Sequence, residues 1–269
     1  VRGFLDMLAA LIRTRRPDRV VCALDHDWRP AWRVALVPTY KAHRVGADGN
    51  EVVPETLVPQ VPLLLDLLAA LGVPVVGVAG YEADDVLGTL AAREPAPVEV
   101  ASGDRDLFQL VDDDRPVRLL YCGRGVAKLE ECDDAAVRAR YGVPAAAYAD
   151  FAVLRGDPSD GLPGVPGVGE KTAARLVARY GSLAGILAAL DNPAADLAPG
   201  LRARLTAARD YLTVAPSVVR VALDVPLPPL ETTLPAAPAD PDRLLALAET
   251  WNLAGPCRRL VDALAANAR

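Results

Sequence analysis

Three apolar runs in the first hundred residues each lead into acidic residues. The runs span residues 19–24, 73–78 and 98–101, and each has the length and composition of a buried strand. If the strands are parallel, their carboxyl ends share one edge of a sheet, which is where such sheets bind ligands. The spacing therefore predicts a cluster of six carboxylates, which are Asp25, Glu82, Asp84, Asp85, Asp104 and Asp106.

The pairing of these acids favours metal chemistry over helix capping. A single aspartate such as Asp84 is explained equally well as a helix cap, but one cap needs only one side-chain oxygen. Crowded carboxylates repel one another and raise one another's pKa unless cations neutralise them. Few basic residues are placed to pair with them, so we expect two or more Mg²⁺ or Mn²⁺ ions. Two such ions about 4 Å apart activate a water and stabilise the leaving oxygen in phosphodiester hydrolysis.

Two further aspartates, Asp157 and Asp160, lie in the segment GDPSDG. They are either additional metal ligands or members of an Asx turn. The chain has a formal net charge of −6, but the remainder is positive if eight of its acids share one metal site. The net charge therefore does not exclude a nucleic-acid partner.

A glycine-rich segment, Leu162 to Ala173, predicts a tight hairpin that leads into a helix. Gly164, Gly167 and Gly169 permit sharp backbone turns. The amides at the start of the following helix, with Lys171 beside them, suit a nucleic-acid phosphate. The segment has the pattern of a helix–hairpin–helix element, and an ordinary connection between two helices is the alternative.

Aromatic and basic residues alternate between Asp25 and Pro54, outside any convincing strand or helix pattern. Aromatic rings stack on unpaired bases and basic groups bind phosphates, so this composition suits single-stranded nucleic acid. The alternative is a solvated basic loop whose tryptophans fold onto the core. The residues concerned are Trp28, Arg29, Trp32, Arg33, Tyr40, Lys41, His43 and Arg44.

The elements that would position these residues change in character along the chain. Strand-like and helix-like segments alternate at first, which predicts an α/β domain with a parallel sheet covered on both faces over residues 1–140. Helix-like segments then follow one another, which predicts a helical domain over 141–269. A proline-rich stretch at 226–241 leads to two terminal helices. The earlier helices are expected at 3–15, 54–71, 83–92, 106–111, 133–141, 145–155, 170–180, 182–190 and 201–213, with a fourth strand at 117–121.

The composition sets further limits on the class of protein. A hydrophobic content of 52% argues against a wholly disordered chain. No uninterrupted apolar run reaches the roughly 18 residues of a membrane helix, so we expect no membrane partner. The four cysteines form no CxxC pair, which indicates neither a zinc site nor a disulfide framework and suits the reducing cytoplasm.

Taken together, these motifs resemble those of the bacterial 5′-3′ exonuclease and flap endonuclease family, which includes the N-terminal nuclease domain of DNA polymerase I. The matching segments follow the family's order: ALD, YKAHR, GYEADD, SGDRDL, GDPSD and LPGVPGVGEKTA. The resemblance implies a PIN-like nuclease domain, with a helical arch at about 28–54, followed by a helix-three-turn-helix DNA-binding domain. It also implies a metal-dependent 5′-3′ exonuclease and flap endonuclease that acts in primer removal and repair.

The resemblance assigns roles to residues at matching positions. The implied metal ligands are Asp25, Glu82, Asp84, Asp85, Asp104, Asp106, Asp157 and Asp160. Lys41 and Arg44 are implied to act in catalysis. The DNA-binding residues are expected to be Arg29, Arg33, Tyr40, Lys41, Arg44, Gly164, Gly167, Gly169, Lys171 and Thr172. The family's hairpin also coordinates a K⁺ ion.

Two departures from the family pattern stand out. The family begins with a strand that carries another metal-binding aspartate, and we expect that strand to lie upstream of this sequence. The family usually has asparagine where Gly161 stands. A nuclease-inactive module for branched DNA and a PIN-domain ribonuclease are the alternatives. We expect a monomer in the nucleoid that acts on DNA with 5′ ends, flaps or branches, alongside a separate DNA polymerase.

Overall fold

The computed structural model describes residues 1–47 and 49–268, except for the side chain of Val126. The chain forms two compact units. Unit 1 combines Val1–His26, Glu51–Val78 and the residues from Pro226 onward, whereas unit 2 combines Asp27–Asn50 with Ala79–Val225. Each unit therefore contains segments that are distant in the sequence.

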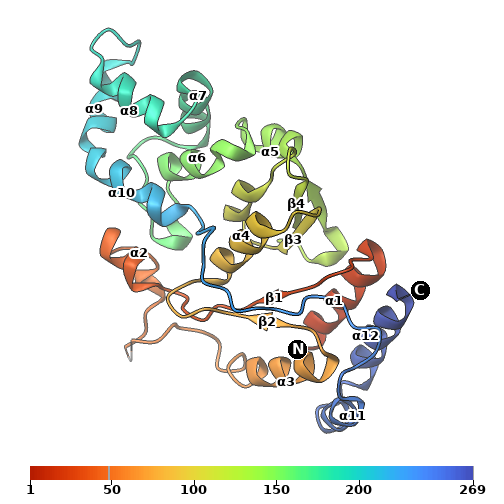
Figure 1. Cartoon of the computed structure of the whole chain (residues 1–269). Coiled ribbons are helices and arrows are strands. Elements are labelled where there is room, and N and C mark those ends of the chain that lie inside the picture. Colours follow the sequence, from red (N-terminus) through yellow and green to blue (C-terminus); the bar gives the residue numbers. More distant parts are fainter. Residues whose placement is uncertain (48, 269) are drawn as a thin grey trace. The chain divides into compact units, whose positions relative to one another are not determined.

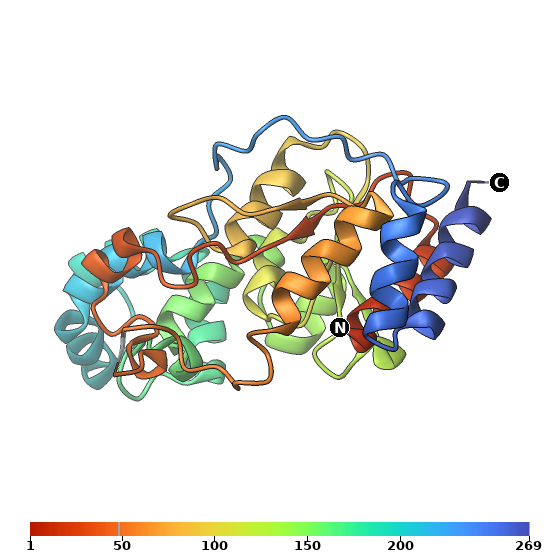
Figure 2. The same cartoon turned by 90° about the horizontal axis from the view of Figure 1, so that it is seen from below.

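Unit 1 is built around a short parallel strand pair. Strand β1 (Cys22–Ala23) pairs with β2 (Val75–Val76), and four helices complete the unit (Figures 1 and 2). Leu5 and Ile12 on the first helix and Leu260 on the last are fully buried in one apolar cluster. The helices are α1 (Arg2–Arg15), α3 (Gln60–Leu71), α11 (Pro241–Thr250) and α12 (Ala254–Asn267).

The proline-rich segment of unit 1 is more ordered than a linker. The amide of Val20 donates to the carbonyl of Thr232 at 3.0 Å, and the amide of Leu234 donates to the carbonyl of Asp18 at 2.9 Å.

Helix α3 begins at Gln60 instead of the predicted Pro54. Pro54 and Pro59 lack the amide hydrogens that a helix interior requires, which explains the later start.

Unit 2 contains a three-stranded sheet in the order β3-β4-β5. Strand β3 (Val98–Ser102) is parallel to β4 (Val117–Tyr121), in the register Val98 to Val117. Strand β5 (Glu130–Cys132) pairs antiparallel with β4. The parallel pairs confirm the predicted α/β class. Strand β5 was not predicted because its three residues, Glu-Glu-Cys, lack apolar alternation.

Helices make up the rest of unit 2, and the predicted helical character after residue 133 is confirmed. The expected helix at 201–213 is instead two helices, which meet at Ala208. The helices are α2 (Ala31–Leu36), α4 (Ala83–Arg93), α5 (Asp134–Tyr141), α6 (Tyr148–Arg155), α7 (Glu170–Tyr180), α8 (Leu183–Asp191), α9 (Pro199–Ala207) and α10 (Arg209–Val219). The single-turn helices are η1 (Ala42–Arg44), η2 (Asp106–Leu110), η3 (Val126–Lys128), η4 (Ala145–Ala147) and η5 (Pro158–Asp160).

In the part of the chain that the structure describes, no single helix is long and apolar enough to cross a membrane. Helices α7 and α8, which meet at a bend of 80°, reach the required length and composition only as a pair. The four cysteines, all within the described residues, are free thiols.

Candidate active site

The acids at the start of α4 form a buried ion-pair network in unit 2. Arg33, on α2, donates from Nη1 to Glu82 Oε2 at 2.5 Å and to Asp85 Oδ2 at 2.7 Å. Its Nη2 donates to Asp85 Oδ1 at 2.6 Å, and its Nε donates to the carbonyl of Val218 at 3.0 Å. Arg33 is 3% exposed, and its predicted contact with DNA stays a prediction. A guanidinium enclosed by carboxylates and carbonyls has no donor left for a phosphate.

Asp85 belongs to this buried network. It is fully buried, and it also accepts hydrogen bonds from the amides of Ala222 at 2.7 Å and Glu82 at 3.1 Å. The expectation that the acids have few basic partners is therefore wrong. Arg33 precedes its two partners by 49 and 52 residues, which is why the local sequence does not reveal the pairing.

Glu82 is held from its other side by the residues of the YKAHR segment. The hydroxyl of Tyr40 donates to Glu82 Oε2 at 2.7 Å, and the ammonium of Lys41 forms an ion pair with Glu82 Oε1. Tyr40 is 4% exposed, and its predicted role in DNA binding stays a prediction. Burial raises the pKa of Glu82, and the charges of Lys41 and Arg33 oppose that rise. Burial alone would lower the pKa of Lys41, but Glu82 raises it overall.

Other basic and aromatic residues of this segment are tied to the protein backbone. Nε of Arg29 donates to the carbonyl of Tyr40 at 2.7 Å, and indole Nε1 of Trp32 donates to the carbonyl of Gly80 at 3.0 Å. The guanidinium of Arg33 stacks 4.4 Å from the centre of the Trp32 ring. The alternative in which the tryptophans fold onto the protein therefore describes Trp32.

The GDPSDG segment forms a turn that binds three arginines. Asp157 Oδ1 accepts from the amide of Ser159 at 2.8 Å, which is the Asx turn considered as an alternative, and its Oδ2 lies 3.4 Å from both Arg155 and Arg105. Asp160 Oδ1 accepts from Arg44 Nη2 at 2.9 Å. Burial raises the pKa of Asp160. The turn is thus both a structural motif and a source of carboxylates.

Asp104 and Asp106 follow β3 and differ in their surroundings. Asp104 is exposed, and its Oδ1 accepts from the amide of Asp106 at 2.8 Å. Asp106 is half-buried as a residue, but its Oδ1 is enclosed and has no hydrogen-bond partner among the described residues. Burial, together with Asp104, Asp160 and Asp157, raises the pKa of Asp106 to about 7. A cation bound beside Asp106 would oppose this rise and favour the ionised carboxylate.

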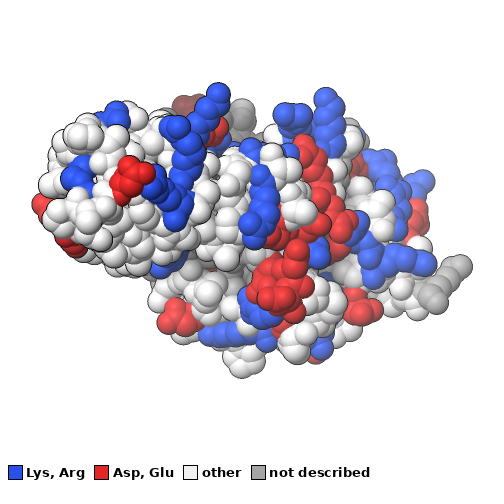
Figure 3. All heavy atoms as spheres, turned by 90° about the horizontal axis from the view of Figure 1, so that it is seen from above, with Lys and Arg blue, Asp and Glu red and all other residues white. Residues whose placement is uncertain are grey.

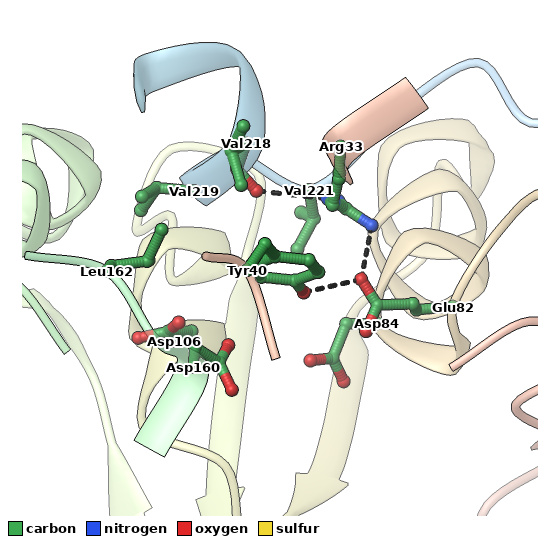
Figure 4. Close-up of a pocket in the computed structure, with 10 residues that line it drawn as sticks. All are labelled: Arg33, Tyr40, Glu82, Asp84, Asp106, Asp160, Leu162, Val218, Val219 and Val221. Carbon is green, nitrogen blue, oxygen red and sulfur yellow. Dashed lines mark hydrogen bonds and ion pairs between the residues drawn. The ribbon is translucent and has the colours of Figure 1, made fainter. Parts of the chain in front are cut away.

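The acids of unit 2 meet in a small pocket that is part acidic and part apolar (Figure 4). Glu82, Asp84, Asp106 and Asp160 provide its carboxylates. The apolar lining comes from the hairpin and from the end of α10, and consists of Leu162, Val218, Val219 and Val221. The structure therefore brings together side chains from three of the predicted acidic motifs.

The pocket fits a divalent cation in its chemistry, although oxygens of Glu82 and Asp160 are engaged by basic side chains. Its ligands are all oxygens, and the enclosed Oδ1 of Asp106 is a site where a hard cation would supply the absent partner. Within residues 1–47 and 49–268, no group of three or more Asp, Glu, His or Cys side chains is arranged to hold an ion. Asp25 follows β1 in unit 1, and its membership of the site stays a prediction.

The glycine-rich hairpin joins α6 to α7 and depends on two glycines in contact. Gly156 and Gly164 have φ of 77° and 63°, and a Cβ on either would lie 2.5–2.8 Å from the backbone around the other. The hairpin ends at Gly169, which precedes α7. Lys171 is exposed in the first turn of that helix and Thr172 is half-buried. The hairpin thus presents the helix start as predicted, and its DNA contacts stay a prediction.

Arg204 was missed as a residue of this hairpin. Its Nη1 donates to the carbonyl of Gly167 at 3.3 Å, from helix α9. The two residues are 37 positions apart, and no local pattern links them.

Figure 3 shows the charges on one face of the molecule. Asp and Glu side chains gather in one area of this face, whereas Lys and Arg side chains are scattered over several places. A net charge of −6 therefore describes this surface poorly, as the sequence indicated.

Comparison with known proteins identifies the family. Residues 1–142 match the 5′-3′ exonuclease N-terminal resolvase-like domain, and residues 143–242 match the 5′-3′ exonuclease C-terminal SAM fold. The chain belongs to the 5′-3′ exonuclease family. The predicted fold class and the prediction of a 5′-3′ exonuclease are confirmed.

Relatives with this description come from Streptomyces and Mycobacterium. A 5′-3′ exonuclease of Streptomyces coelicolor is 58% identical over 99% of this chain and 90% of its own length. One from Mycobacterium tuberculosis is 52% identical over 98% of this chain and 87% of its own length. DNA polymerase I of Mycobacterium tuberculosis is 39% identical over 99% of this chain, a match that covers 28% of the polymerase.

Solved structures share the fold at low sequence identity. The T5 D15 protein co-crystallised with metal ions aligns with a TM-score of 0.64 at 15% identity, over 99% of this chain and 90% of that one. The catalytic core of Rad2 in complex with DNA substrate aligns with a TM-score of 0.58 at 18% identity, over 98% and 82% of the two chains.

Proposed function

We propose that this 5′-3′ exonuclease depends on divalent metal ions, Mg²⁺ or Mn²⁺, and that it also cuts 5′ flaps in DNA. The observation that carries the proposal is the enclosed, unpartnered Oδ1 of Asp106 in a pocket of carboxylates. Support also comes from fold relatives: T5 D15 flap endonuclease was crystallised with DNA and metal ions, and Rad2 with a DNA substrate.

Glu82, Asp84, Asp104, Asp106 and Asp160 are the residues of unit 2 that would hold the ions. Divalent ions bound there would activate a water and stabilise the leaving oxygen of the phosphodiester. Asp104 orients the loop after β3 through its bond to the amide of Asp106. Lys41 and Arg44 are the cations next to this pocket, and they would bind the phosphates of the 5′ strand.

The hairpin and the first turn of α7 would hold the duplex without reading its sequence. Backbone amides at a helix start, with Lys171 beside them, suit phosphates. A K⁺ ion at the hairpin is part of the proposal, and Arg204 on the carbonyl of Gly167 would be its neighbour. We further propose a cytoplasmic, nucleoid-associated monomer that acts with a separate polymerase in replication and repair, in keeping with four free thiols.

Asp106→Asn provides the test, with Asp196→Asn as the matched control on an exposed acid. Cleavage of a 5′-labelled flap and of a recessed 5′ end is measured in Mg²⁺, Mn²⁺ and EDTA, and binding of the same DNA is measured in EDTA. We expect Asp106→Asn to lose at least a hundredfold in cleavage while it binds DNA within tenfold of wild type. Cleavage near the wild-type rate by Asp106→Asn, or undiminished cleavage in EDTA, would refute the proposal.

A further inference from the structure

Gly161 allows two backbone segments of unit 2 to approach more closely than any other residue would. Its φ is 68°, and a Cβ at this position would overlap the carbonyl oxygen of Thr39. The amide of Lys41 donates to the carbonyl of Asp160 at 2.9 Å in the same contact. Asparagine tolerates positive φ, but its Cβ would meet Thr39 in the same way. The glycine is therefore required by the contact and not only by the turn.

This contact sets where two basic side chains lie. Lys41 itself has a φ of 48°, an uncommon conformation for a residue with a side chain. From this backbone position its ammonium reaches Glu82 Oε1, and Arg44 reaches Asp160 Oδ1 at 2.9 Å and the carbonyl of Ser159 at 2.6 Å. We call the contact of Thr39–Arg44 with Asp157–Gly161 the latch.

The latch occupies carboxylate oxygens of the acidic pocket. Lys41 binds Oε1 of Glu82, and Arg33 and Tyr40 bind its Oε2. Arg44 binds Asp160 Oδ1. An ion that binds Glu82 Oε1 or Asp160 Oδ1 must displace a cationic side chain first. The same displacement frees the two cations for another anion.

We propose that the latch competes with divalent ions for Glu82 and Asp160, so that metal binding releases Lys41 and Arg44 toward the phosphates of DNA. This inference rests on the proposed metal site. Because coupling between two ligands is reciprocal, DNA bound by the released cations raises the affinity for the ions by the same factor. The protein thus holds its ions most tightly when DNA is present.

Gly161→Ala tests the latch because its methyl group forces Thr39 away. Gly142→Ala is the matched control: Gly142 has a similar conformation (φ 73°, ψ 14°), and a Cβ there would lie 3.5 Å from Ala174 Cβ, an ordinary contact. Both variants carry the same cost of a positive φ. Lys41→Gln is a second variant, which removes the competing charge without a backbone change.

The readout is Mn²⁺ binding to DNA-free protein, followed by electron paramagnetic resonance. We expect Gly161→Ala and Lys41→Gln to bind Mn²⁺ about tenfold more tightly than wild type, and Gly142→Ala to match wild type. A 5′-phosphorylated single strand should tighten Mn²⁺ binding to wild type and have little effect on Lys41→Gln.

The outcomes separate the latch from the metal site. Wild-type protein without measurable Mn²⁺ binding would overturn both the proposed function and the latch. Wild-type binding that Gly161→Ala and Lys41→Gln leave unchanged would overturn the latch alone. If Gly161→Ala fails to fold, the Lys41→Gln titration decides the question.

Discussion

Removal of the Arg33 guanidinium should destabilise unit 2 far more than removal of a comparable surface arginine. Arg33 makes charge-assisted bonds to Glu82 and Asp85, and the three side chains are at most 6% exposed. Loss of one partner of a buried ion pair costs about 3–5 kcal/mol, because a buried charge is left uncompensated. We expect Arg33→Met to fall near the lower end, about 3 kcal/mol, since Glu82 keeps Lys41 and Tyr40 and Asp85 keeps two backbone amides.

Arg209→Met is the matched control for this change. Arg209 makes the same two-pronged contact, at 2.6 and 2.7 Å, with Asp191. This pair is exposed, so solvent screens it and its loss should have little effect on stability. The contrast between the two variants tests the buried network, because both arginines make a two-pronged contact with an aspartate but only Arg33 is buried and also binds Glu82.

Urea unfolding in the presence of EDTA, followed by circular dichroism, measures the difference in the free energy of unfolding between the two variants. A loss of about 3 kcal/mol corresponds to a fall in melting temperature of roughly 6–12 °C for a unit of this size. Arg33→Lys should fall between wild type and Arg33→Met, since an ammonium cannot make the two-pronged contact. If Arg33→Met loses no more stability than Arg209→Met, the buried network does not stabilise unit 2 and the reasoning fails.

Three further predictions concern the pocket, the hairpin and the arch. The pKa of Asp106 is raised from 3.8 to about 7 in the folded protein. In EDTA, this group should therefore contribute most to the stability below pH 4, and that contribution should be lost as the pH rises through 7. Thermal melting of Asp106→Asn across this range should lack that part of the decline, and an unchanged profile would contradict it. Lys171→Ala should weaken binding to all duplexes and lower the slope of log affinity against log salt by about one, with the exposed Lys128→Ala as control; an unchanged slope would make the hairpin a structural turn only. Lys41→Ala should slow single-turnover flap cleavage more than it weakens duplex affinity. Equal losses in both would mean that Lys41 contributes only to DNA binding.

The sequence predicts which acids share the pocket better than it predicts which basic residues form ion pairs with them. Asp84 and Asp106 line the same pocket as the sequence predicts, although the strands before them, β2 and β3, belong to separate sheets and not to one sheet edge. Arg33 pairs with acids about 50 residues away through a six-residue helix that has no recognisable periodicity. Partners of this kind depend on tertiary packing, which the local sequence does not encode.

Short elements were predicted less well than long ones for a similar reason. Strands β1 and β2 have two residues each, whereas the predicted apolar runs span six. Helix α7 has a strong apolar stripe and was predicted at its observed bounds, Glu170–Tyr180. The requirement for Gly161 was not predictable, because it depends on the backbone of Thr39 more than a hundred residues earlier.

The composition of unit 1 from three distant segments has a consequence for synthesis on the ribosome. Helix α1 emerges before α12, yet Leu5 and Ile12 are buried in a cluster with Leu260 on α12, and Asn267 bonds to Pro17 across 250 residues. At about 5–20 residues per second, the apolar face of α1 waits roughly 12–50 s for this partner. Most of unit 2 is complete by then, because its segments end at Val225. The nascent chain therefore carries a folded unit 2 beside an exposed apolar helix, which is the form that a chaperone would meet.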